Sequence, residues 1–413
     1  MPCLGAIPCE AVVVGDGILG LNIAWELSER NLRVVVFCKP HDASPQADTL
    51  RNHGWLQSGL LYAASPNAGN RKAAWEMRES AKNMLQRASM TYPEARGVFR
   101  MPAESQQATE FVNAVGELGM SKLVERINER EARERLGPFF LPSFIHFLVP
   151  DTTFDQAELL NILRWRLERH FHVEFRPEEV SLVQESASSS GFVIQSQGVL
   201  FEAQHTFLCA GSGNVSLLQQ LGLSTPLAVF RSALMDVPLG GVMNTPLLVD
   251  LSRESSSHVT AGLSVAHHEP CPNMPEGCLV IGSRSRRKLI NPEVREVSQE
   301  EAADLEKLAP EAIRRHPAFR DRRFVAGHKT EGVDELGVPS VNATFHQWPE
   351  YPGLVSANPG KATLAFYSAK RATKDIISRK ATAARFIRTL SGVKYHTHPE
   401  LYYRHVNDLK KVQ

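Results

Sequence analysis

The chain has 413 residues, of which 43% are hydrophobic and 22% are charged, an ordinary composition for a globular protein of two or three domains. A formal net charge of +1 argues against a nucleic-acid-binding protein. No apolar run is long enough to span a bilayer, and the six cysteines form no CxxC pair, so we expect neither a transmembrane segment nor a metal site. Two cysteines end apolar runs typical of buried strands, which favours reduced thiols and a cytoplasmic location.

The N-terminal segment predicts a strand, a helix and a second strand. Residues 11–14 are apolar and β-branched, as in a central strand of a parallel sheet. Residues 21–30 carry apolar side chains on one side and predict a helix, and residues 33–38 predict another buried strand. This order is typical of a Rossmann-like α/β domain.

Three glycines stand between the first strand and the helix. Gly15 permits a tight turn, Gly17 lets a pyrophosphate approach the backbone, and Gly20 lets the helix pack closely on the strand. Ile18 and Leu19 complete the loop, and their position predicts that they lie at the helix N-terminus, where free N–H groups bind phosphates. The segment therefore predicts a dinucleotide-binding loop.

The second strand ends in Cys38 and Lys39, where this fold normally has an Asp or Glu that binds the adenosine ribose. One interpretation is that other contacts hold FAD and that Cys38 only fills space. The other is a preference for the 2′-phosphate of NADPH, with Lys39 as its partner. We favour FAD because of the later segments.

The rest of the chain alternates helices with strands and is rich in strands between residues 226 and 282. This pattern favours a second domain built on a sheet. Further helices are expected at residues 70–86, 104–118, 157–172, 215–221, 298–315 and 363–390, and further strands at 205–210, 227–237, 259–263, 278–281 and 354–356.

Several segments, in the same order across most of the chain, resemble the FAD-dependent D-amino-acid oxidase-like superfamily, nearest to its L-2-hydroxyglutarate oxidase and glycine oxidase branches. The glycine loop and the late Asn358-Pro359-Gly360-Lys361-Ala362-Thr363 segment are the more specific matches. The other matching segments are residues 51–62, 154–157, 208–211, 226–231 and 324–339.

The resemblance implies FAD as cofactor and a two-domain fold. The Rossmann-like FAD-binding domain would comprise residues 1–95, 145–225 and 325–390. The substrate domain, an antiparallel sheet with helices, would comprise residues 96–144 and 226–324, followed by a polar tail at 391–413. The FAD contacts that it implies are Gly15, Gly17, Ile18, Leu19, Gly20, Cys38, Lys39, Asn52, His53, Gly54, Gln57, Ala210, Gly211, Gly360, Lys361, Ala362 and Thr363.

Two of these residues are candidates for a role in the reaction. His53 is the candidate base nearest the segment that resembles the flavin-binding one, although it would equally serve to hydrogen-bond FAD or the backbone. Lys361, at the start of a predicted helix, would place positive charge beside the flavin ring, or else face solvent. Gln57 stands where the hydroxyglutarate branch has a histidine.

Three other residues are candidates for substrate binding. Arg231 would clamp a carboxylate with its planar fork, or lie at the surface at a strand end. Lys329 stands where many relatives have an arginine that binds the substrate carboxylate, and solvent exposure is the competing interpretation. Tyr62 would orient the substrate or pack in the core.

We therefore expect a FAD-dependent oxidoreductase that oxidises a small, carboxylate-bearing amine, amino acid or 2-hydroxy acid by hydride transfer to flavin. The alternatives are an NADPH-linked reductase and a flavoprotein-fold subunit that binds partners without catalysis. The sequence leaves the electron acceptor open among oxygen, a quinone and a partner flavoprotein, and it indicates no oligomeric state.

Overall fold

The computed structural model describes residues 6–39, 48–63, 65, 68–169, 173–183, 191–224, 227–251, 262–270, 276–288, 296–333, 339–351 and 353–374. The chain divides into a unit of residues 1–372 and a second unit of residues 373–413. The expected polar tail at 391–413 and the expected helix beyond residue 374 lie outside the described residues. Among the described residues, no helix has the length and apolar character needed to cross a membrane.

The first sheet confirms the predicted Rossmann-like order. Five of its strands run parallel to their neighbours, as the N-terminal pattern predicted, and β18 and β10 are added antiparallel to β19 and β11. Its central strands are almost fully buried because both faces of such a sheet are covered. The strand order is β18 (Thr344–Gln347), β19 (Leu354–Asn358), β11 (Val199–Leu208), β1 (Ile7–Val14), β2 (Val34–Phe37) and β8 (Val173–Arg176). In addition, β10 (Phe192–Ser196) pairs with β11, and β9 (Ser181–Leu182) pairs with β10.

The helices that join these strands begin close to the predicted positions. Helix α1 (Ile18–Ser28) begins three residues earlier than expected because the second half of the glycine loop already forms its first turn. Every residue of α1 is buried, which explains why its sequence is not strongly amphipathic. Helices α5 (Gln156–Glu168) and α6 (Gly213–Gln219) follow the expected segments.

The second sheet is antiparallel except where β13 and β4 run parallel. The expected strand 259–263 falls partly outside the described residues, and β14 begins just after it. The strand order is β17 (Pro339–Ser340), β16 (Arg323–Val333), β12 (Leu227–Val237), β15 (Cys278–Lys288), β14 (Ser264–His268), β13 (Leu247–Asp250), β4 (Gly97–Pro102), β6 (Phe144–Val149) and β5 (Glu125–Ile127).

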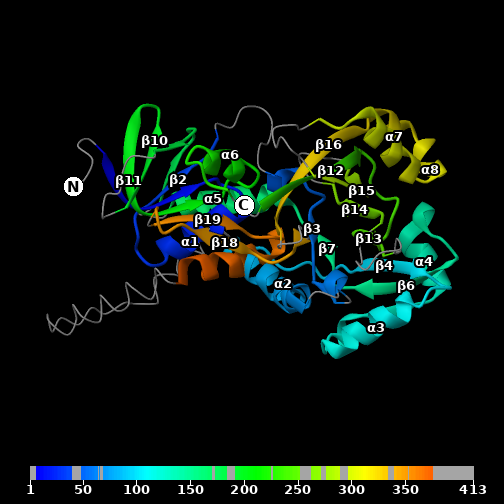
Figure 1. The fold of residues 1–413 in the computed structure, drawn as a ribbon. Coiled ribbons are helices and arrows are strands. Elements are labelled where there is room, and N and C mark those ends of the chain that lie inside the picture. The colour runs from blue at the N-terminus through cyan, green and yellow to red at the C-terminus, as the bar shows by residue number, and fades with distance from the viewer. Residues whose placement is uncertain are drawn as a thin grey trace, which may run out of the picture. The chain divides into compact units, whose positions relative to one another are not determined.

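Of the helices in the second part, α3 (Gln107–Glu117), α7 (Gln299–Leu308) and α8 (Glu311–Arg314) lie in segments that were expected to be helical, whereas α4 (Glu129–Leu136) was not expected. The predicted helix 298–315 is divided into α7 and α8 because Pro310 cannot continue the hydrogen-bond pattern of α7. In Figure 1 the strands of the first sheet lie on one side of the unit and those of the second sheet on the other.

Two expected domain boundaries differ from the sheets, the first by one strand (β6) and the second by two (β16 and β17). The expected boundaries placed most of β6 and β16, and all of β17, in the FAD domain, but these strands belong to the second sheet. Strand β16 pairs with β12 from Leu227 opposite Gly332 to Asp236 opposite Arg323. The chain therefore reaches the first sheet again only at β18, after passing the cavity described below.

Short elements connect the two sheets. The two-stranded ribbon of β3 (Trp55–Leu56) and β7 (Thr152–Thr153) lies between them in Figure 1. Helix α2 (Ala68–Arg87) contacts the 3-10 turn at Ala362–Leu364, after which residues 365–372 are helical. These connections bring segments from the start and the end of the unit to one place.

Candidate active site

A cavity of about 690 Å³ opens at the carboxyl ends of the parallel strands β1, β2, β11 and β19. Ligands of open α/β sheets bind at this edge because the connecting loops leave a crevice there. Its volume lies in the range of small-molecule sites. The expected site residues that line it are Gly15, Gly17, Ile18, Leu19, Cys38, Lys39, Asn52, His53, Gln57, Ala210, Gly211, Lys329, Gly360, Lys361, Ala362 and Thr363.

The three glycines have the separate tasks that the sequence predicted. Gly15 has a φ of 108°, and a Cβ there would lie 2.6 Å from the Cys209 carbonyl oxygen. A Cβ on Gly20 would lie 1.8 Å from the Gly15 carbonyl oxygen, so these two glycines allow close packing. At Gly17 the nearest atom is Thr49 Oγ1 at 3.6 Å, so a side chain would fit the fold but occupy the cavity.

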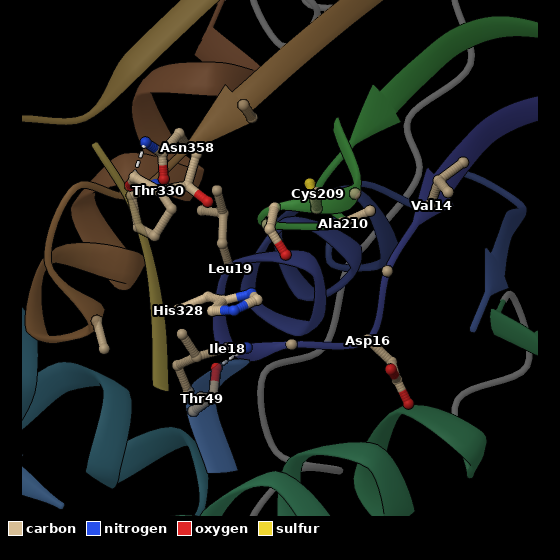
Figure 2. A pocket seen from close by; sticks show the side chains of 18 of the residues that line it. Val14, Asp16, Ile18, Leu19, Thr49, Cys209, Ala210, His328, Thr330 and Asn358 are labelled. Carbon is tan, nitrogen blue, oxygen red and sulfur yellow. Dashed lines mark hydrogen bonds between the residues drawn. The ribbon is translucent and has the colours of Figure 1, made fainter. Parts of the chain in front are cut away.

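The N-terminus of α1 opens on this cavity. Its N-cap is Gly17, which has no side chain to occupy the N–H groups of the first turn, and the Ile18 N–H donates to Thr49 Oγ1 at 3.4 Å (Figure 2). Backbone N–H groups and the positive end of the helix dipole bind phosphate. The cradle therefore fits the pyrophosphate of a dinucleotide.

A buried asparagine fixes the turn after β11. Asn214 Oδ1 accepts from the Ala210 N–H at 2.9 Å, and its Nδ2 donates to the Leu208 carbonyl at 3.0 Å. Gly211 follows with a φ of 56°, in the left-handed region that favours glycine. The sequence marked this segment only as a strand followed by a turn, whereas Asn214 holds the turn against the cavity.

The opposite end of the cavity is cationic. Lys361 is buried, its Nζ lies 2.8 Å from Glu331 Oε1, and it lies 5.8 Å from the centre of the Tyr62 ring. Lys329 of β16 lines the same cavity. Both lysines are close enough to His53 that their charges lower the pKa of its imidazole.

His53 is enclosed at this end. Burial first, and then the charges of Lys329, His268 and Lys361, lower the pKa of His53 to about 3. Its ring packs edge-on against Trp55, with 5.7 Å between centroids, and its Nδ1 is buried without a hydrogen-bond partner. His53 is therefore a neutral acceptor at physiological pH and a weak base.

Other cavity-lining atoms also lack protein partners. Gln57 Oε1, Thr330 Oγ1 and Thr363 Oγ1 are buried without a hydrogen bond in the part of the chain described. Buried polar groups in native proteins are nearly always satisfied by protein, water or ligand. Their gathering on one wall fits a polar ligand such as a flavin ring with its substrate, which supports FAD at this site.

Four expected site residues do not line the cavity, and the clearest correction concerns Arg231. Its guanidinium is buried and binds both carboxylate oxygens of Glu301, at 3.0 and 2.8 Å, and the Glu296 carbonyl at 2.7 Å. The carboxylate that Arg231 clamps therefore belongs to helix α7 of the protein. The reason is that its side chain projects from β12 toward α7, which covers this strand.

The other three are Tyr62, Gly54 and Gly20. Tyr62 packs in the hydrophobic core and reaches the site only through its contact with Lys361. Gly54 has a φ of 63°, and a Cβ there would lie 2.7 Å from the His268 ring, so it serves a tight turn. Gly20 also lies behind the lining, as its packing role requires.

Several lining residues were not expected from the sequence. Asp16 and His328 are two of them, and neither was assigned a role from the sequence. The alternation of His328 and Thr330 along a strand could have indicated a shared face. The remaining ones include Thr49, Trp55, Phe154, Gln156, Glu178, Glu179, Val180, Ser212, Ser216 and Gln220.

Comparison with known proteins identifies the family of this fold. Glycine oxidase from Geobacillus kaustophilus superposes with a TM-score of 0.67 at 18% identity, covering 91% of this chain and 95% of that one. NikD, an unusual amino acid oxidase, gives 0.68 at 16% identity, covering 90% and 95%. L-proline dehydrogenase from P. horikoshii gives 0.63 at 14% identity, covering 90% and 94%.

No curated protein sequence matches the chain. The sequence profile of the FAD dependent oxidoreductase family, known as DAO, matches residues 10–373, which include the glycine loop and the final loop at the cavity. This match and the fold confirm the resemblance to the D-amino-acid oxidase-like superfamily. The chain belongs to the FAD-dependent oxidoreductases of the DAO family, and FAD is its cofactor.

Proposed function

We propose that the protein oxidises a small amine or amino acid that carries a carboxylate. The observation that carries this proposal is the cavity end where Lys329 and Lys361 surround a neutral His53. Two lysines at one end of an enclosed site attract and orient an anionic group. The relatives named above, two amino acid oxidases and an L-proline dehydrogenase by their titles, agree with this class of substrate.

The state of His53 favours an amine over a 2-hydroxy acid. Oxidation of a C–OH bond needs a base for the hydroxyl proton, and a base with a pKa of about 3 is poorly matched to neutral pH. A neutral amine already has the lone pair that forms the C=N bond, and needs no such base. The positive potential that disfavours protonated His53 also disfavours a protonated amine, and so promotes the reactive form.

Each group then has a defined task. FAD, when bound, supplies the acceptor for the hydride that leaves the substrate carbon. Lys329 binds the carboxylate, Glu331 holds the Lys361 ammonium in place, and Lys361 adds the second positive charge. His53 Nδ1 accepts a hydrogen bond from the substrate amine. The proposal includes a cytoplasmic location, supported by four buried free cysteines among the described residues.

The test is anaerobic mixing of the purified holoprotein with amino acids, N-alkyl amino acids, their amides and 2-hydroxy acids, with loss of the visible flavin absorption as readout. We expect bleaching by one or more amino acids and none by the amide of the same compound, which lacks the carboxylate. Bleaching by 2-hydroxy acids alone would contradict the amine, and equal bleaching by acid and amide would contradict the carboxylate.

A further inference from the structure

The end of β2 cannot supply the charged acceptor that usually binds the adenosine ribose. Cys38 is buried, and its Sγ lies 3.5 Å from the Arg176 carbonyl oxygen. Burial first, and then the charge of Asp16, raise the pKa of the Cys38 thiol to about 11. Cys38 is therefore a neutral thiol at physiological pH, and a different group must accept from the ribose hydroxyls if the nucleotide end is to be held.

Asp16 lies beside this position. It stands in the loop between Gly15 and Gly17 and lines the cavity together with Cys38. In Figure 2 its carboxylate extends from the loop toward the helix below, α5. The second strand and the glycine loop meet here because the Gly15 N–H donates to the Phe37 carbonyl at 2.7 Å.

Arg164 of α5 holds the Asp16 carboxylate from outside the cavity. Its Nη1 lies 3.1 Å from Asp16 Oδ2, while its Nε donates to Glu168 at 3.0 Å and its guanidinium lies over the Phe175 ring. Arg164 does not line the cavity. The Cys38 thiol also hydrogen-bonds to the Asp16 carboxylate, which offers about four acceptor positions, and the contact with Arg164 orients it.

The surrounding charges favour hydroxyl groups over a phosphate. Glu178 and Glu179, from the segment after β8, line the same wall as Asp16. Lys39, the cation expected to bind a 2′-phosphate, lies 3.4 Å from Glu179, and both side chains are mostly exposed. Three carboxylates against two cations, Lys39 and the Arg164 that pairs with Asp16, leave an excess of negative charge here, which suits hydrogen-bond donors and disfavours a 2′-phosphate.

We propose that Asp16, positioned by Arg164, binds the adenosine ribose hydroxyls of FAD in place of the acid missing at Cys38. The aspartate reaches the ribose site from the glycine loop, whereas the usual acid reaches it from the end of the second strand. The assignment depends on FAD as the cofactor and is independent of the substrate proposed above.

The test is titration of apoprotein with FAD, followed by flavin fluorescence. The parent is measured first, which establishes FAD binding separately from the role of Asp16. Asp16→Asn should weaken binding about ten- to a hundredfold, because a hydrogen bond to a charged acceptor is lost. Glu117→Gln, which removes an exposed carboxylate of α3 that does not line the cavity, is the control and should stay within about threefold.

Two further variants make the result specific. Cys38→Glu alone should not tighten FAD, because a second carboxylate would face Asp16, but in the Asp16→Asn background it should restore affinity. Arg164→Met should weaken FAD in the parent and have little effect in the Asp16→Asn background if Arg164 acts only by positioning Asp16.

An FAD analogue without the adenosine 2′- and 3′-hydroxyls distinguishes contact from indirect damage. If Asp16 binds the ribose, Asp16→Asn should weaken the analogue much less than it weakens FAD. An equal loss for both ligands would overturn the proposal, as would an FAD affinity of Asp16→Asn within threefold of the parent.

Discussion

The two ends of the cavity carry opposite charges. At the nucleotide end lie Asp16, Glu178 and Glu179, with Lys39 and Arg164 as their cations. At the other end lie Lys329, the ion pair of Lys361 with Glu331, and the uncharged imidazole of His53. The net charge of the whole chain, +1, gives no sign of this separation. Under the two proposals above, this difference in charge selects the ligand at each end: hydroxyl donors at one, a carboxylate at the other.

The largest effect is expected from a variant that cannot bind FAD, the ligand that would occupy both ends of the cavity. Gly17→Leu should fold as the parent does, because a side chain there meets only Thr49, but it should fill the space of the pyrophosphate. We expect FAD affinity to fall at least a hundredfold, about 2.7 kcal/mol, in fluorescence titrations.

The matched control for this variant is Gly116→Ala in α3, where a Cβ meets only Ser121 Oγ at 3.7 Å. It should leave FAD binding unchanged. FAD binding by Gly17→Leu at the affinity of the parent would contradict the placement of the pyrophosphate at this loop.

The second prediction concerns the cationic end in the apoprotein. The folded-state pKa of His53, about 3, lies below its unfolded value, so the unfolded chain takes up a proton first as the pH falls. Stability is therefore lost progressively below about pH 6.5, by about 1.4 kcal/mol per pH unit from this group. His53→Gln should remove that part of the slope.

Urea unfolding at several pH values measures this slope. The control is His316→Gln, an exposed histidine, which should retain the pH dependence of the parent. The same slope in the parent and in His53→Gln would show that burial and the two lysines do not suppress protonation of His53.

The third prediction concerns the proposed carboxylate-binding role of Lys329. Lys329→Ala should raise KM for the substrate identified by the screen about ten- to a hundredfold, because one charge-assisted contact is lost, and should leave the flavin spectrum intact. Lys307→Ala, an exposed lysine on α7, is the control. Kinetics of Lys329→Ala within twofold of the parent would remove this residue from the substrate site.

The smallest effect is expected at the nucleotide end. Lys39 and Glu179 form an exposed pair, and such pairs contribute little. Lys39→Ala should change FAD affinity by no more than about threefold. NADPH should not displace FAD from the parent. If NADPH does displace FAD from the parent but not from Lys39→Ala, Lys39 would be identified as the partner of a 2′-phosphate.

The sequence by itself determined the first sheet and the cofactor loop. The conformation of the glycine loop could be predicted because backbone sterics and local spacing fix it. The loop places Gly15, Gly17 and Gly20 between a buried strand and a helix. The final loop at Gly360–Thr363 was identified through the resemblance of its short pattern to the family, and it lines the cavity. The family and FAD followed from these local patterns.

Only the tertiary structure decided what each charged side chain does. Arg231 and Lys329 both read as candidate carboxylate ligands, yet one binds Glu301 and the other lines the cavity. Asp16 and Arg164 meet across 148 residues of sequence. Strand periodicity predicts that alternate residues face opposite sides of a sheet. It does not predict which element covers each side, because that depends on long-range packing. The covering element in turn sets the partner, the burial and the pKa of each side chain.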